Sequence, residues 1–127
     1  MSRCLLIAAA LIWAAPAARA QAADSLPPCV SPAMVTAGRQ LFHGAGICMS
    51  CHGQDGRGIR NLAPALHDAE WLHADGSYDS IVQRILIGVP LDQSKTGIIM
   101  PPRGGSRLTD DQVRAVAAYV WTLRREQ

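Results

Sequence analysis

Three stretches of the chain place apolar residues three or four positions apart, which is the spacing of an amphipathic helix. The first helix is expected from Pro32 to about His43, and the second from Tyr78 to Leu86 or Ile87. The third is expected from Asp110 to about Arg124. The residues expected to face the core are Met34, Val35, Gly38, Leu41 and Phe42, then Ile81, Val82 and Ile85, and finally Val113, Val116, Ala117, Val120 and Leu123.

Residues that favour helix ends flank these stretches. Ser31 can cap the first helix and Ser77 the second, since a hydroxyl can accept a hydrogen bond from a free backbone N–H of the first turn. Thr109 and Gln112 fit a capping box for the third helix. Gly88 is expected to end the second helix.

The segments between the helices, 53–76 and 89–107, are rich in glycine, proline and polar residues and follow no sustained period. We expect loops there, with one or two short helical turns in 53–76. No segment alternates between apolar and polar residues as a strand would. The pattern predicts an all-α domain of about three to five helices, whose long loops need something to pack on.

Bulky core residues are scarce in this sequence. The whole chain has one phenylalanine, two tyrosines and three tryptophans, and Trp13 lies in the apolar run near the N-terminus. Aromatic side chains supply much of the area that a small domain buries. A large apolar cofactor at the centre would supply the missing bulk.

The N-terminus has the pattern of a secretory signal peptide: a basic residue, an apolar run and Ala18-Arg19-Ala20 as a cleavage site. The apolar run Cys4–Ala18 is 15 residues long, shorter than the roughly 17–25 that span a bilayer. An uncleaved anchor is the alternative. We expect a cleaved signal peptide at 1–20, a flexible leader at 21–30 and a folded domain at 31–127, in an exported, periplasmic protein with no stable membrane insertion after cleavage.

The charge balance argues against a nucleic-acid-binding protein. The formal net charge of +2 includes Arg3 and Arg19 of the expected signal peptide, so acids and bases are equal in number without them. Nucleic-acid binders carry a basic surface, which a neutral exported chain does not predict. Export also places the cysteines in an oxidising compartment, where free thiols are usually paired or otherwise used.

Two cysteines and a histidine stand within the five residues Cys48-Met49-Ser50-Cys51-His52. A structural zinc site needs four ligands, and a second ligand-spaced pair is missing. A thioredoxin-like dithiol needs a βαβ context, which the pattern lacks. A plain disulfide leaves His52 without a role. Cys-x-x-Cys-His is the attachment signature of c-type haem, and this interpretation uses all three residues.

Haem attachment assigns each residue a chemical task. The sulfurs of Cys48 and Cys51 add to the two vinyl groups, and the imidazole of His52 ligates the iron. Met100 is the candidate for the second axial ligand, because Pro101 and Pro102 restrict the backbone beside it. Ligation by histidine and methionine raises the reduction potential and closes the iron to other ligands.

A ligating histidine needs an acceptor for its other ring nitrogen. The carbonyl of Pro64, in the sequence Leu62-Ala63-Pro64-Ala65-Leu66, is the candidate, and Leu66 is expected to pack on the porphyrin. His67 and His73 are expected to be exposed loop residues.

On these motifs the chain resembles the class I, mitochondrial-like c-type cytochromes, over about residues 33–123. The matching segments, in family order, are Ala37–Phe42, Cys48–Gly53, Gly56–Gly58, Ala63–Leu66, Ile85–Gly88, Met100–Pro102, Leu108–Asp110 and Val116–Trp121.

The resemblance implies the cytochrome c fold, with helices and long loops wrapped around one covalently attached haem. It implies that the first and last helices cross closely at Gly38, with Phe42 meeting the face that carries Tyr119. It also implies a hydrogen-bond donor at a haem propionate, for which Trp71 and Arg60 are candidates. The segment 89–99 before Met100 is longer than the family pattern.

The resemblance implies a periplasmic one-electron carrier rather than an enzyme, similar to small cytochromes that accept electrons from dehydrogenases and pass them to an oxidase or another cytochrome. The chain could also be the cytochrome subunit of an oxidoreductase complex. A peroxidase-like haem enzyme or a small-ligand sensor is the alternative if Met100 is not a stable ligand. Lys95, Arg103 and Arg107 predict a basic rim that docks an acidic partner, and Cys29 has no partner in the mature chain.

Overall fold

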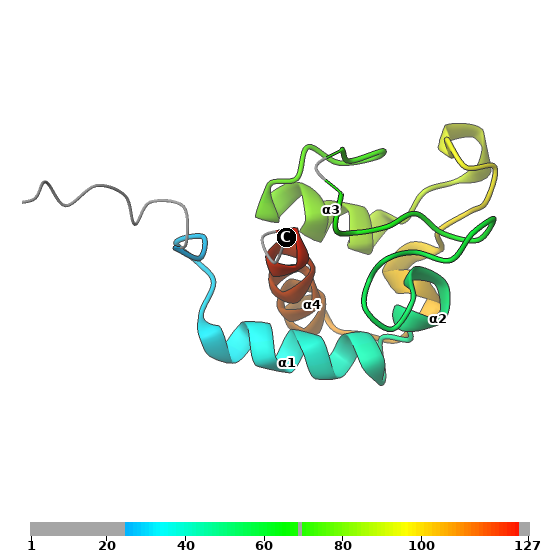
Figure 1. Cartoon of the computed structure of the whole chain (residues 1–127). Coiled ribbons are helices and arrows are strands. Elements are labelled where there is room, and N and C mark those ends of the chain that lie inside the picture. Colours follow the sequence, from blue (N-terminus) through cyan, green and yellow to red (C-terminus); the bar gives the residue numbers. More distant parts are fainter. Residues whose placement is uncertain (1–24, 69, 125–127) are drawn as a thin grey trace, which may run out of the picture.

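The computed structural model describes residues 25–68 and 70–124 (Figure 1). Two isolated backbone bridges, Ile59–Ala63 and Val89–Met100, occur in this part of the chain, which forms no strand. The predicted all-α class is confirmed. The elements in order are α1 (Pro32–His43), α2 (Met49–His52), α3 (Tyr78–Ile87), the 3₁₀ turns η1 (Leu91–Gln93) and η2 (Pro102–Gly105), and α4 (Asp110–Leu123).

The three long helices begin at the residues that the sequence predicted, because each has a side-chain cap. The Ser31 hydroxyl accepts a hydrogen bond from the Met34 amide at 3.2 Å. Ser77 caps α3 in the same way. Thr109 and Gln112 form the predicted capping box, each side chain accepting from the backbone N–H of the other residue at 3.3 and 2.9 Å.

The crossing of α1 and α4 organises the core, and Figure 1 shows α4 almost end-on where it lies across α1. Gly38 makes the close approach possible, since a Cβ there would collide with the Ala115 carbonyl oxygen and lie 3.0 Å from the Tyr119 Cβ. Phe42 is fully buried and meets the Tyr119 ring edge-on at a centroid distance of 5.3 Å. The close crossing implied by the family resemblance is therefore present.

The core is otherwise aliphatic and centred on α4, which is buried along most of its length. Val35 and Leu41 of α1 pack against it as predicted, whereas Met34 is half-buried and does not join the core cluster.

The segment 53–76 contains turns and bends but no helix among its described residues, so the predicted short helical turns are absent. Segment 89–107 contains η1 and η2. Most of the backbone hydrogen bonds of these segments join residues of the same segment, as in the bonds from Leu66 to Gly56 and between Val89 and Met100.

Part of the expected leader contacts the domain. The Val30 amide donates to the Pro27 carbonyl at 2.8 Å, and Leu26 packs against the core cluster. The expected signal peptide and residues 21–24 lie outside the described residues. Within the described ranges, no helix has the length and hydropathy needed to cross a bilayer.

The helix crossing predicts the effect of one added methyl group. Gly38→Ala should lower the free energy of unfolding by about 1–3 kcal/mol, because overpacking at the crossing outweighs the higher helix propensity of alanine. Chemical denaturation of the holoprotein measures this value. Ala37→Ser, which adds one atom at the exposed neighbouring position, is the control. A Gly38→Ala protein as stable as the parent would contradict the tight crossing.

Candidate cofactor site

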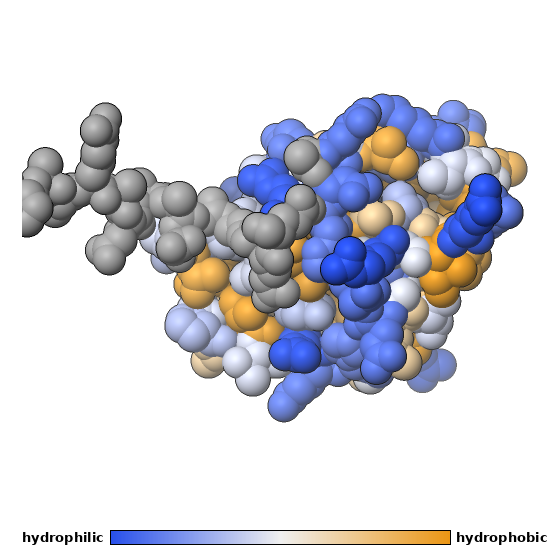
Figure 2. Space-filling view, viewed as in Figure 1, coloured by the Kyte–Doolittle hydropathy of each residue, from blue (hydrophilic) through white to orange (hydrophobic). Residues whose placement is uncertain are grey.

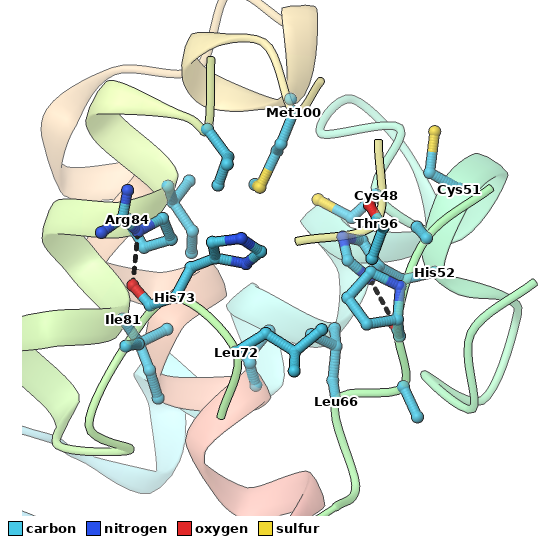
Figure 3. Close-up of a pocket in the computed structure, with 18 of the residues that line it drawn as sticks. Cys48, Cys51, His52, Leu66, Leu72, His73, Ile81, Arg84, Thr96 and Met100 are labelled. Atoms are coloured by element: carbon cyan, nitrogen blue, oxygen red, sulfur yellow. Dashed lines mark hydrogen bonds between the residues drawn. The ribbon is translucent and has the colours of Figure 1, made fainter. Parts of the chain in front are cut away.

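A cavity of about 290 Å³ lies beside α2, between the loops 53–76 and 89–101 and the inner faces of α3 and α4 (Figure 3). Most of its wall is apolar, with Ile81 and Ile85 from α3 and Val116 and Val120 from α4. The residues predicted for the haem site that line this cavity are Cys48, Cys51, His52, Pro64, Leu66, Trp71 and Met100.

The two cysteines occupy different sides of the α2 turn. The Cys48 thiol points into the cavity, and its burial raises its pKa to about 11, so it stays protonated at neutral pH. Cys51 is exposed, with its sulfur directed away from the cavity (Figure 3). Thioether bonds at both positions require the Cys51 side chain to turn inward, and its exposed position leaves room for that rotation.

His52 is buried and held in one orientation by the loop that follows it. Its Nδ1 donates a hydrogen bond to the Pro64 carbonyl at 2.9 Å, the bond expected from the sequence (Figure 3). Nε2 is then the nitrogen available to the cavity. Burial lowers the pKa of His52, and the hydrogen bond to Pro64 opposes that shift. A neutral imidazole of fixed orientation is the form that ligates a metal.

A glycine turn brings Pro64 back to His52. Gly58 has φ +78°, and its N–H donates to the His52 carbonyl at 2.7 Å. A Cβ at Gly58 would lie within 2.8 Å of the backbone of residues 63–65. The turn therefore requires glycine both for its backbone conformation and for its packing.

Met100 lines the same cavity as His52 but enters it from a different segment, with its sulfur directed inward (Figure 3). Its backbone is paired with Val89, with N···O distances of 2.7 and 3.0 Å. Gly88 packs closely against the Met100 carbonyl. The methionine is thus fixed to the end of α3, although it lies in a long loop.

The indole of Trp71 provides a test of whether haem fits this cavity. Its Nε1 is buried and has no hydrogen-bond partner among the described residues. An unpaired buried donor is costly, so the arrangement calls for an acceptor. A haem propionate is such an acceptor, and Trp71 lines the cavity in which haem would lie.

The structure does not place Arg60 at this cavity. Arg60 is exposed at the tip of the loop that the Ile59–Ala63 bridge closes. The arginine that lines the cavity is Arg84, whose Nε donates to the His73 carbonyl at 2.7 Å and whose guanidinium also donates to the Gly88 carbonyl at 3.0 Å. No sequence motif distinguished Arg84, although it lies one helical turn after Ile81 on the face of α3 that lines the cavity.

The two loop histidines are less exposed than the sequence predicted. His67 is half-buried and its Nε2 contacts the Asp55 carbonyl. His73 is half-buried and its ring points into the cavity (Figure 3). The cavity itself explains the second difference, since an inward-facing position on an irregular loop has no sequence period.

The zinc interpretation finds no support in the part of the chain that the structure describes. No group of three or more His, Cys, Asp and Glu side chains there could hold a metal ion. The cavity instead brings together the imidazoles of His52 and His73, the Met100 thioether and the two thiols of the attachment motif, a set that suits c-type haem.

Comparison with known proteins agrees with this geometry. Residues 35–124 match the family model of cytochrome c.

The chain belongs to the cytochrome c family.

Among its relatives is the cbb3-type cytochrome c oxidase subunit CcoP of Rhodobacter capsulatus, 38% identical over 98 residues that cover 72% of this chain and 30% of that subunit. The FixP subunit of Rhizobium meliloti is 38% identical over 93 residues, covering 72% and 28%. This cytochrome spans less than a third of the length of these relatives. Among solved structures, cytochrome cL of Methylophaga aminisulfidivorans matches with a TM-score of 0.54 and 26% identity, over 72% of this chain and 53% of that one.

Membership of the family supports the predicted fold and the predicted cofactor. This cytochrome carries haem c, bound covalently through the Cys48-x-x-Cys51-His52 motif. The family also supports an electron-transfer protein rather than an enzyme, as predicted.

Removal of the attachment cysteines tests whether haem is structural. A Cys48→Ala/Cys51→Ala variant should be largely unfolded, because the apolar faces of α3 and α4 at the cavity lose the group that covers them. Circular dichroism during thermal denaturation measures this. A compact variant that melts cooperatively would contradict a structural role for haem.

The reduction potential tests the role of Trp71. Trp71→Phe should lower the midpoint potential of this cytochrome, since a propionate that loses a hydrogen bond carries more effective negative charge and favours Fe(III). Trp121→Phe, a buried tryptophan outside the cavity, should leave the potential unchanged. Equal potentials for the two variants would show that the Trp71 indole does not reach the haem.

Proposed function

We propose that this cytochrome is a one-electron carrier whose haem iron is ligated by His52 and Met100. The observation that carries the proposal is the placement of the two side chains, which come from different segments and line one cavity (Figure 3). Two protein ligands leave the iron no open position for a substrate. The bound haem supplies a one-electron couple between Fe(II) and Fe(III).

The chain contributes rigid support for both ligands. The imidazole of His52 is oriented by the Pro64 carbonyl, and Met100 is fixed by its pairing with Val89 and by the prolines that follow. Ligands that are fixed by hydrogen bonds to neighbouring backbone groups keep their geometry in both oxidation states. Small structural change favours fast electron transfer, which is the property a carrier needs.

The surface beside α2 is the side on which we propose that redox partners dock. Ile47, Met49 and Leu62 are exposed there and line or border the cavity. Figure 2 shows hydrophobic residues on the side of the molecule where α2 lies, next to strongly hydrophilic ones. An apolar contact surface with a polar rim is typical of weak, transient complexes.

The predicted basic rim is smaller than the sequence suggested. The Arg103 guanidinium donates to the Leu108 carbonyl at 2.8 Å and pairs with Asp110 at 2.6 Å. The Asp110 carboxylate therefore offsets its positive charge. Lys95 and Arg107 are exposed. We therefore expect salt to weaken partner association only modestly.

The partners we propose are redox proteins of the periplasm, the compartment that the expected signal peptide indicates. Relatives named as cbb3 oxidase subunits support an oxidase or another cytochrome as the acceptor. A dehydrogenase is the proposed donor. The chain would act as a free carrier or as the cytochrome subunit of an oxidoreductase complex.

Carbon monoxide binding and electron self-exchange test this proposal without a partner. The reduced parent protein should not bind carbon monoxide, and self-exchange measured by NMR should be fast. Met100→Ala should bind carbon monoxide and exchange more slowly, because its iron has an open position.

Met34→Ala is the matched control, since Met34 is a half-buried methionine of α1 that does not line the cavity, and this variant should behave as the parent. Ready carbon monoxide binding by the parent would favour a sensor or a peroxidase-like enzyme over a carrier.

A further inference from the structure

The segment 94–99, here called the strap, crosses the cavity just before Met100. Thr96, Ile98 and Ile99 line the cavity, and Thr96 also lines a neighbouring hollow formed by residues 57–64. The strap therefore forms part of the wall of both the cavity and this hollow. It belongs to the long insertion between Val89 and Met100, whose two ends are joined by the Val89–Met100 bridge.

Within the strap, one side chain organises the backbone. The Ser94 hydroxyl accepts hydrogen bonds from the amides of Thr96 and Ile98 at 3.3 and 3.2 Å and lies 2.7 Å from the Ile98 carbonyl, to which it donates. These bonds shape the strap but do not attach it to the rest of the domain.

The attachment lies at His73. The Lys95 amide donates a hydrogen bond to the His73 Nε2 at 3.1 Å, across 22 positions of sequence. The His73 backbone is itself held by α3, through the bond from Arg84 to its carbonyl. His73 thus connects the strap to a helix that is anchored in the core.

The acceptor at Nε2 exists only in one protonation state of the ring. A neutral imidazole with its proton on Nδ1 accepts at Nε2, whereas the imidazolium has a proton on both nitrogens and accepts at neither. Protonation therefore removes the hydrogen bond from the Lys95 amide, because the Nε2–H of the imidazolium then faces the N–H of Lys95. We propose that neutral His73 is the residue that positions the strap over the cavity, and that protonation of His73 releases it.

The charges around the ring give the direction of the pH dependence. Burial lowers the pKa of His73, and the positive charges of Arg84 and Lys95 lower it further, while the Gln93 carbonyl raises it. Asp68 and Glu70 line the same cavity, but the groups that shift the pKa of His73 do not include them. The folded state binds the proton less readily than the unfolded chain, whose histidine has a pKa of 6.5. The strap is therefore held above pH 6.5 and is released as the pH falls below that value.

Release would change the haem environment as well as the loop. Solvent exposure is one of the factors that set the reduction potential of haem, and the strap forms part of the cavity wall. This consequence rests on the proposed function, but the bond between strap and histidine does not.

Hydrogen exchange of the reduced holoprotein tests the proposal. Protection of the strap amides, corrected for intrinsic exchange rates, should fall about tenfold between pH 8 and pH 5 in the parent. The amides of Val89 and Met100 should keep their protection and serve as the internal reference. The absorption spectrum of the same samples reports separately whether Met100 stays bound.

Two variants distinguish hydrogen-bond acceptance by His73 from a purely structural role of its side chain. His73→Gln retains an acceptor and cannot be protonated in this range, so its strap should be protected at both pH values. His73→Phe has no acceptor, so its strap should exchange rapidly at both. Loss of protection in His73→Gln at pH 5 to the same extent as in the parent, or full protection in His73→Phe, would overturn the proposal.

Discussion

The fold depends on a haem that completes a core the protein chain leaves open. The inner faces of α3 and α4 carry aliphatic side chains that end at a cavity rather than at another element. The chain has one phenylalanine, Phe42, which packs on Tyr119 where α1 crosses α4 and contributes only part of the cavity wall. Burial of these faces against the porphyrin supplies apolar contact that the chain cannot make alone.

The two loops that carry the ligand contacts are stabilised in different ways. The loop after α2 turns tightly at Gly58, and its return places the Pro64 carbonyl on His52. The loop before α4 is longer and is closed at its base by the pairing of Val89 with Met100. Both devices fix a proposed iron ligand through backbone hydrogen bonds, so that long irregular segments can still hold His52 and Met100 in place.

The helices and the attachment motif were predictable from the sequence, because their causes are local. Ser31, Ser77 and Thr109 cap the helices that follow them, and Cys48-x-x-Cys51-His52 is a contiguous motif. The bond between Pro64 and His52 was also expected, since a ligating histidine needs an acceptor.

The errors concern residues whose place depends on how loops fold back. Arg60 lies outside the cavity while Arg84 lines it, and His73 faces the cavity instead of solvent. Arg103 forms an ion pair within the fold rather than part of an open basic rim. Arg60, His73 and Arg103 lie outside the α-helices, so no helical period shows which way their side chains point.

The visible absorption spectrum of the holoprotein, oxidised and then reduced, tests the central claim most directly. The account predicts the sharp reduced band of low-spin c-type haem and, in the oxidised protein, the sulfur–iron charge-transfer band at the red end of the spectrum. Together these bands would show that His52 and Met100 hold the iron within the core. A high-spin spectrum without the sulfur–iron band would contradict that arrangement.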